Sequence, residues 1–148
     1  MIRIGHFAFM AMILASSGGS SQEVKLGTLK VVLEGFKNQN GQVKVGLEKS
    51  AQDFDKGPLH EAHYRGEIAA IKGSEVTLTF RDVPYGTYAV KAFHDADSNG
   101  ELNSNFVGIP TEDYGFSNNV RGTMGPASFQ DARFEFNAEE KTLRIHLK

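Results

Sequence analysis

The chain of 148 residues contains no cysteine, so disulfides, a cysteine nucleophile and a cysteine-ligated zinc site are all excluded. It also contains no tryptophan, and an aromatic platform for a carbohydrate is a weaker prediction without it. Lysine and arginine number 16 against 18 aspartates and glutamates, and they form no basic run. A nucleic-acid partner is therefore not predicted. No apolar stretch after residue 21 is long enough to span a bilayer, so no membrane span is predicted after signal cleavage.

Signatures of common enzyme classes are missing as well. The segment Gly115–Asn119 lacks the second glycine of a nucleophile elbow, and no phosphate-binding or dinucleotide-binding glycine loop occurs. His60 and His63 are one residue too close together for the zinc-binding His-Glu-x-x-His motif. These absences favour a non-enzymatic protein. The alternative is an envelope hydrolase or other enzyme with its site around His94 and Asp95, where an imidazole adjoins a carboxylate.

The N-terminal segment has the composition of a signal peptide. A short basic start precedes the apolar stretch Phe7–Ala15, and a run of serine and glycine follows it. The pattern predicts a signal peptide over residues 1–21, a single mature domain over residues 22–148, and a periplasmic or secreted protein. Cleavage after Ser17 and cleavage after Ser21 both fit the small-residue rule. The alternative is a buried N-terminal helix, against which the serine and glycine run argues.

Apolar and polar residues alternate in several short segments, which is the pattern of half-buried β-strands. A weaker segment of the same kind covers Tyr64–Ile71. The pattern predicts an all-β fold, an antiparallel β-sandwich of about seven strands, immunoglobulin-like or transthyretin-like, with one long ordered loop. The side chains expected to point into the core are Val31, Val45, Leu78, Val90, Phe134 and Ile145.

Turn residues and two insertions separate these strands. The segment Asn38–Gly41 links the first two strands, and its Asn-Gly pair favours a hairpin turn with positive φ. The insertions are Ser50–His63 and Asp95–Asp131, and short helical turns are predicted within Ala51–His63 and Ser128–Ala132. Loops as long as the second insertion are usually functional or disordered, and its apolar residues favour an ordered one.

The second insertion opens like the first half of an EF-hand-type calcium loop. Side chains with oxygen atoms occupy alternate positions before Gly100, which permits a sharp bend. The second half departs from the pattern, because Phe106 stands where a bidentate glutamate belongs. Asp113, Asn118 or Asn119 are candidates to complete the coordination. The alternative is an Asx-rich turn whose side chains bond to their own backbone. The candidate Ca²⁺ ligands are the side chains of Asp95, Asp97, Asn99 and Asn103 and the backbone carbonyl of Glu101.

Several runs in and before this insertion are typical of one bacterial family. They are Val83–Asp95, Asn99–Leu102, Asn105–Pro110, Tyr114–Asn119 and Gly125–Phe129. On these residues the chain resembles the bacterial domain of unknown function 2141 (DUF2141) family over nearly all of its mature length. The resemblance implies a small, exported, β-rich protein with no agreed activity. The family often has aspartate at position 103, where this chain has Asn103.

Further side chains in or beside the insertion are candidates to anchor the loop or to contact a partner. His94 ends a strand next to Asp95, where hydrogen bonds would orient its imidazole. The sequence therefore predicts an exported, non-enzymatic module that binds a ligand or partner through Asp95–Asp131, with Ca²⁺ as its candidate cofactor. The predicted partner is an envelope protein or a carbohydrate. The candidate residues are His94, Asn105, Tyr114, Phe116, Asn118 and Asn119.

We predict that the mature chain begins between Gly18 and Gln22 and is recovered outside the cytoplasm, because cleavage follows small residues. N-terminal sequencing of the exported protein measures this directly. An intact Met1 on the exported protein would contradict the prediction.

Overall fold

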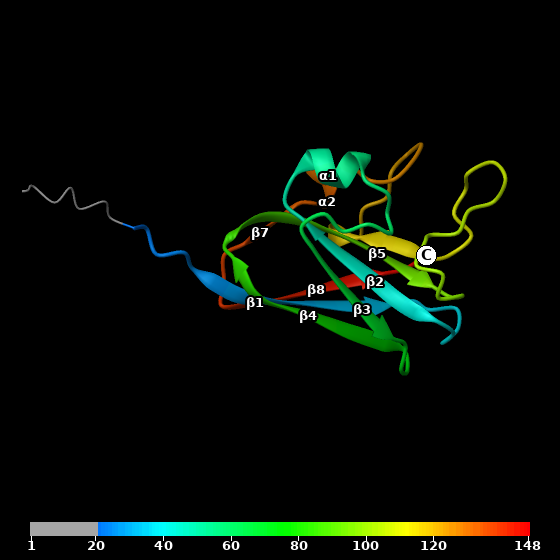
Figure 1. Ribbon diagram of the computed structural model, residues 1–148, viewed down its shortest axis with the longest axis horizontal. Helices are drawn as coiled ribbons and strands as arrows, with labels where there is room; N and C mark the ends of the chain where they lie inside the picture. The colour runs from blue at the N-terminus through cyan, green and yellow to red at the C-terminus, as the bar shows by residue number, and fades with distance from the viewer. Residues whose placement is uncertain (1–20) are drawn as a thin grey trace, which may run out of the picture.

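The computed structural model describes residues 21–148, which form two β-sheets facing one another (Figure 1). The predicted signal peptide, residues 1–21, lies outside the described residues except for Ser21. One sheet has three strands and the other has five, and all pairs but one are antiparallel. The predicted all-β sandwich is confirmed.

The three-stranded sheet contains the two ends of the described chain. Its strands are β1 (Leu26–Glu34), β4 (Glu75–Pro84) and β8 (Glu140–His146), in the order β4-β1-β8. Strand β1 is antiparallel to β4 and parallel to β8. In β1 the alternate residues Leu29, Val31 and Leu33 lie in the core, because successive side chains of a strand point to opposite faces.

The five-stranded sheet carries the helices and the long insertion. Its strands are β2 (Gln42–Glu48), β3 (Arg65–Ala70), β5 (Gly86–Asp95), β6 (Tyr114–Phe116) and β7 (Phe134–Phe136). The order is β3-β2-β5-β6, and β7 pairs with the first residues of β5. The helices are α1 (Ala51–Lys56), the 3₁₀ helix η1 (Ser117–Asn119) and α2 (Phe129–Ala132). The predicted helical turns and the weak strand at residues 64–71 are therefore confirmed.

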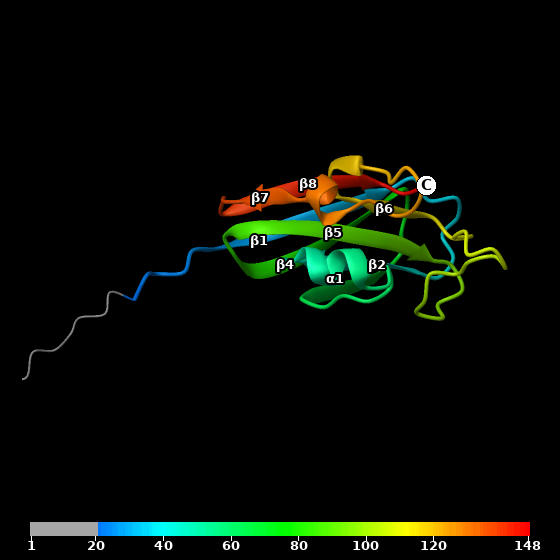
Figure 2. The ribbon, with the colours of Figure 1, turned by 90° about the horizontal axis from the view of Figure 1, so that it is seen from above.

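The connection between β1 and β2 differs from the predicted hairpin. Gly41 does have a positive φ of 67°, but β1 and β2 pair in different sheets, so the segment crosses from one sheet to the other. A side chain at Gly41 would collide with the backbone carbonyl of Asp95. Glycine is needed here because the crossover passes directly over the end of β5, and both lie at the same end of the sandwich (Figure 2).

The main core lies between the two sheets and contains every position that the sequence assigned to it. Its buried side chains include Val31, Val45, Leu78, Val90, Phe134 and Ile145. The inward-facing positions inferred from the alternation are therefore confirmed.

A second apolar cluster covers the outer face of the five-stranded sheet. Its buried members are Phe54, Ala89, Phe116, Ala127 and Ala132. Helices α1 and α2 lie on this side of the sheet (Figure 1), and each begins with a serine that accepts a hydrogen bond from its first turn. As a result β5 is buried from Tyr88 to Asp95 on both faces. None of the helices described in residues 21–148 has the length and apolar content needed to cross a membrane.

We predict that Phe134→Ala lowers the free energy of unfolding by about 3–5 kcal/mol, because it removes a buried ring from the main core. Lys30→Ala should change it by less than about 0.5 kcal/mol, because Lys30 forms only a surface ion pair with Glu140. Urea unfolding of both variants compares the two effects. Equal changes in the free energy of unfolding would contradict the assignment of Phe134 to the core and Lys30 to the surface.

Candidate functional site

The turn after β5 is built around the buried carboxylate of Asp95. Its Oδ1 accepts a hydrogen bond from the Asn99 N–H at 3.1 Å, and its Oδ2 accepts from the Gly100 N–H at 2.9 Å. Oδ2 also accepts from the side chain of Gln42 on β2 at 2.8 Å, and Lys44 on β2 donates to the Gly100 carbonyl at 2.8 Å. Asp95 therefore closes the turn and joins it to the neighbouring strand.

Asp97 and two asparagines continue this network on the surface. Asp97 accepts hydrogen bonds from the Asn99 N–H at 3.2 Å and from the Asn103 side chain at 2.8 Å. The Asn103 hydrogen bond is the main cause that lowers the pKa of Asp97. Asn99 in turn accepts from the Glu101 N–H at 2.8 Å and donates to Asn103 at 2.6 Å. Both asparagine amides are thus engaged within the turn.

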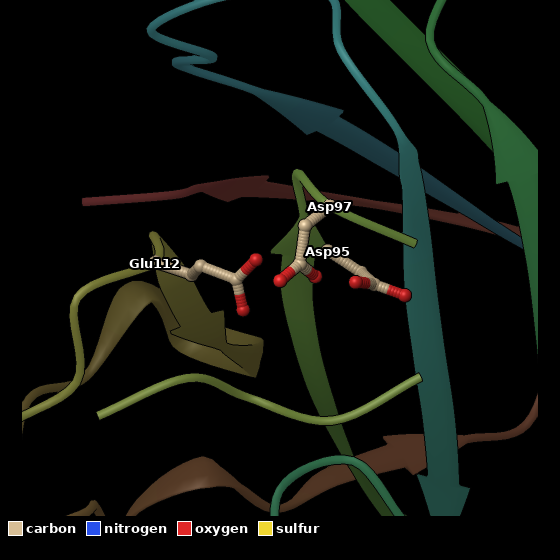
Figure 3. Close-up of side chains that lie close together, drawn as sticks. All are labelled: Asp95, Asp97 and Glu112. Atoms are coloured by element: carbon tan, nitrogen blue, oxygen red, sulfur yellow. The ribbon is translucent and has the colours of Figure 1, made fainter. Parts of the chain in front are cut away.

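The structure adds Glu112 to the acidic group that the sequence predicted. Carboxylate oxygens of Asp95, Asp97 and Glu112 lie within 4.8 Å of one another (Figure 3). Glu112 accepts hydrogen bonds from the N–H groups of Ala96 at 2.8 Å and Asn103 at 2.9 Å. No sequence spacing identifies Glu112 as a neighbour of Asp95, because only the path of the folded chain between them brings the two residues together.

The other residues predicted to complete a calcium site lie elsewhere. Asp113 is buried and forms an ion pair with Lys37 at 2.5 Å. Asn118 and Asn119 bind backbone carbonyls of other segments. The Glu101 carboxylate is not in the group of three, and the sequence pattern predicts that Glu101 binds through its backbone carbonyl. Three converging carboxylates suit a hard cation such as Ca²⁺, whereas their N–H donors are those of a self-bonded Asx turn. The structure is therefore compatible with both hypotheses from the sequence, the calcium site and the self-bonded Asx turn.

His94 joins the loop to the crossover between the sheets. Its ring is buried, its Nε2 lies 2.7 Å from the carbonyl oxygen of Asn40, and its edge contacts Phe36. Its backbone N–H donates to the Asp113 carbonyl at 2.8 Å. His94 therefore holds together three segments that are distant in the sequence.

The asparagines of the insertion fix its shape through backbone hydrogen bonds. Asn105 accepts from the N–H groups of Val107 and Ile109, both at 3.0 Å. Asn118 and Asn119 both have positive φ, a conformation that asparagine tolerates better than most residues. The Asn118 side chain donates to two carbonyls around α2 and β7, and the Asn119 side chain binds the backbone of β8 on both its donor and acceptor sides.

The predicted single long loop is in fact divided by β6 and η1. Tyr114 and Phe116 lie on β6, which pairs with β5 opposite Phe93 and Lys91. A side chain at Gly115 would collide with Ile145, so glycine allows β6 to lie against β8. The strand has only three residues, too few for an alternation pattern to reveal it.

A cleft of about 580 Å³ lies between the two halves of this insertion and α1. Its volume is in the range of small-molecule sites, roughly 300–1,000 Å³. Aromatic and aliphatic side chains form most of its walls, and its charged lining residues are Lys91 and Asp55. His94, Asp95 and Arg121, the groups expected to converge in an enzyme site, do not line this cleft. The wall residues include Phe54, Leu59, Ile109, Tyr114, Phe116 and Met124.

These features define a class of protein, an all-β sandwich whose loop insertions enclose a cleft of ligand size on the outer face of one sheet. The family model for "Uncharacterized protein conserved in bacteria (DUF2141)" matches residues 31–144, and the chain belongs to this family. The resemblance found in the sequence is thereby confirmed. No curated protein and no solved structure matches the chain.

We predict that calcium raises the melting temperature and that a chelator lowers it, because a ligand of the folded state adds about 2.7 kcal/mol at a hundredfold excess over its dissociation constant. Asp97→Ala and Glu112→Gln should abolish the calcium response, because each removes one carboxylate of the acidic group. Glu101→Gln is the matched control and should keep it. Calorimetry with and without chelator measures the shift. If the melting curves with and without chelator superimpose at millimolar calcium, the calcium hypothesis is wrong and the segment is a self-bonded Asx turn.

Proposed function

We propose that this protein is an exported, non-enzymatic binding module that takes a small ligand with an apolar body in the cleft beside β6. The observation that carries the proposal is the cleft itself, about 580 Å³ and walled mainly by apolar side chains. Export rests on the signal-peptide pattern of residues 1–21.

Exposed apolar side chains around the cleft support an apolar ligand. Met124 is 100% exposed and Ile109 is 60% exposed, and both line the cleft. Phe106 is 99% exposed on the same loop as Ile109. Grouped apolar side chains on a protein surface mark interaction sites, since they gain free energy when a partner covers them. Of the two predicted partner classes, a carbohydrate fits less well, because it requires polar groups along the walls.

The alternative of an enzyme around His94 and Asp95 has less support from the geometry. Both side chains are buried, and their polar atoms bind Asn40, Gln42 and the turn backbone. A catalytic group must reach its substrate within hydrogen-bond distance. The cleft is therefore the better candidate for ligand contact.

The test is an NMR titration of the ¹⁵N-labelled protein with neutral apolar fragments. We expect chemical-shift changes at Leu59, Tyr114 and Gly122, which line the cleft from three different segments. Ile68 serves as an internal control, because it is exposed on β3 and does not line this cleft. Shifts confined to residues outside the cleft, or no shifts at all, would contradict the proposed function.

A further inference from the structure

Lys91 is a buried lysine that lines an otherwise largely apolar cleft. Its side chain leaves the outer face of β5, where only 1% of the residue is exposed to solvent. Gly46 lies opposite on β2, and a side chain there would press against the methylene groups of Lys91. The glycine therefore leaves room for the lysine side chain beside β2.

The ammonium of Lys91 retains hydrogen-bonding capacity. It donates to the Pro58 carbonyl at 3.0 Å and lies 3.4 Å from the Glu48 carboxylate. An ammonium has three N–H donors, and within residues 21–148 these two oxygens are its partners. The ammonium therefore has one N–H donor beyond these two contacts.

Glu48 lies beside this lysine and does not line the cleft. One of its oxygens accepts from the His63 N–H at 3.0 Å, and the other has no hydrogen-bond partner among residues 21–148. Of the two paired residues, Lys91 and not Glu48 thus lines the cleft. Burial lowers the pKa of the Lys91 ammonium, and Glu48 opposes this shift.

A buried ion pair of this kind is weak as a stabilising device. Replacing such a pair by apolar residues of similar size is often neutral or stabilising, because both charges must be removed from water. The Lys91 pair is also incompletely hydrogen-bonded. Its position in a ligand-sized cleft therefore indicates a role in recognition.

The chemistry of the cleft changes from its floor to its mouth. Lys91 lines the buried end of the cleft, while the apolar side chains of Ile109 and Met124 line its exposed end. The other charged lining residue, Asp55, accepts a hydrogen bond from the Phe129 N–H at 2.6 Å. A ligand that matches this gradient has one anionic end and an apolar chain.

We infer that the ligand is an aliphatic carboxylate, whose head group accepts a hydrogen bond from Lys91 and whose chain runs between Ile109 and Met124. This inference rests on the proposed function, because it assigns the ligand class of the same cleft.

The experiment compares decanoate, decanol and decyltrimethylammonium, which share a chain but differ in the charge of the head group. Each is titrated below its aggregation concentration while the amides of the cleft are followed by NMR. We expect decanoate to bind at least about tenfold more tightly than decanol, because its head forms a charge-assisted hydrogen bond. Decyltrimethylammonium should bind most weakly, because it places a second cation beside Lys91.

Variants separate the head group from the chain. Lys91→Met alone would leave Glu48 buried without its cation, so the double variant Lys91→Met/Glu48→Gln is used. It should bind decanoate and decanol with similar affinity. Lys30→Met is the matched control, because Lys30 also pairs with a glutamate but lies in the other sheet. It should retain the preference for decanoate.

Met124→Ser should weaken all three compounds, because Met124 is fully exposed and lines the cleft. Ile68→Ser is its control, because Ile68 is also exposed but lies on β3 outside the cleft lining, and it should leave the affinities unchanged.

Two negative results are distinguishable. If decanoate and decanol shift the cleft amides with equal affinity in the wild-type protein, the carboxylate inference is overturned while the binding cleft stands. If none of the three compounds shifts the cleft amides, the inference falls, and failure with the neutral fragments as well overturns the proposed function. The wild-type comparison decides the inference even if the double variant does not fold.

Discussion

Strand β5 is buried on both faces from Tyr88 to Asp95, and the arrangement of the loops depends on this burial. One face packs into the main core, and the other is covered by α1 and α2. Buried polar groups need hydrogen-bond partners, so His94 and Asp95 at the end of the strand bind segments that reach them from β2 and its preceding crossover. The insertion consequently starts from a fixed point, and its two halves are held in place to form the cleft.

The sequence predicts the strands well, because a strand buried on one face alternates apolar and polar residues, and this alternation is visible in the sequence. It predicts the pairing of those strands poorly. The Asn-Gly pair before β2 indicates a turn correctly, but the same conformation serves a crossover between sheets and a hairpin. Strand β6 is too short to show a period at all.

The residues of the candidate sites likewise divide into those that a local sequence pattern reveals and those that it does not. Asp95, Asp97 and Asn99 are recognisable because their spacing along one turn is itself the signal. Glu112 and the pairing of Lys91 with Glu48 depend on contacts between distant segments, and no local pattern records them. Lys91 stands in a strand where alternation places it opposite the main core, which in a simple sandwich means solvent. Its burial depends on the segment after α1, where the Pro58 carbonyl accepts a hydrogen bond from its ammonium.

The acidic turn and the cleft are physically continuous. Asn103 is held by Asp97 and Glu112, and its neighbours Leu102 and Ser104 line the cleft. A cation that binds the three carboxylates must share their oxygens with the donors of Asn103. A cation bound at these carboxylates would therefore act on hydrogen bonds that hold one wall of the cleft.

The parallel pairing of β1 with β8 has a consequence for how the protein acquires its structure. Thr28 pairs with Glu140 at the opposite end of the described chain, so the central strand of one sheet lacks a neighbour until the last strand has been synthesised. Folds dominated by such distant contacts fold slowly, on the order of milliseconds to seconds. During that interval the apolar face of β1 is without half of its sheet. The chain is therefore expected to stay unfolded or partly folded for longer than a helical protein of the same size.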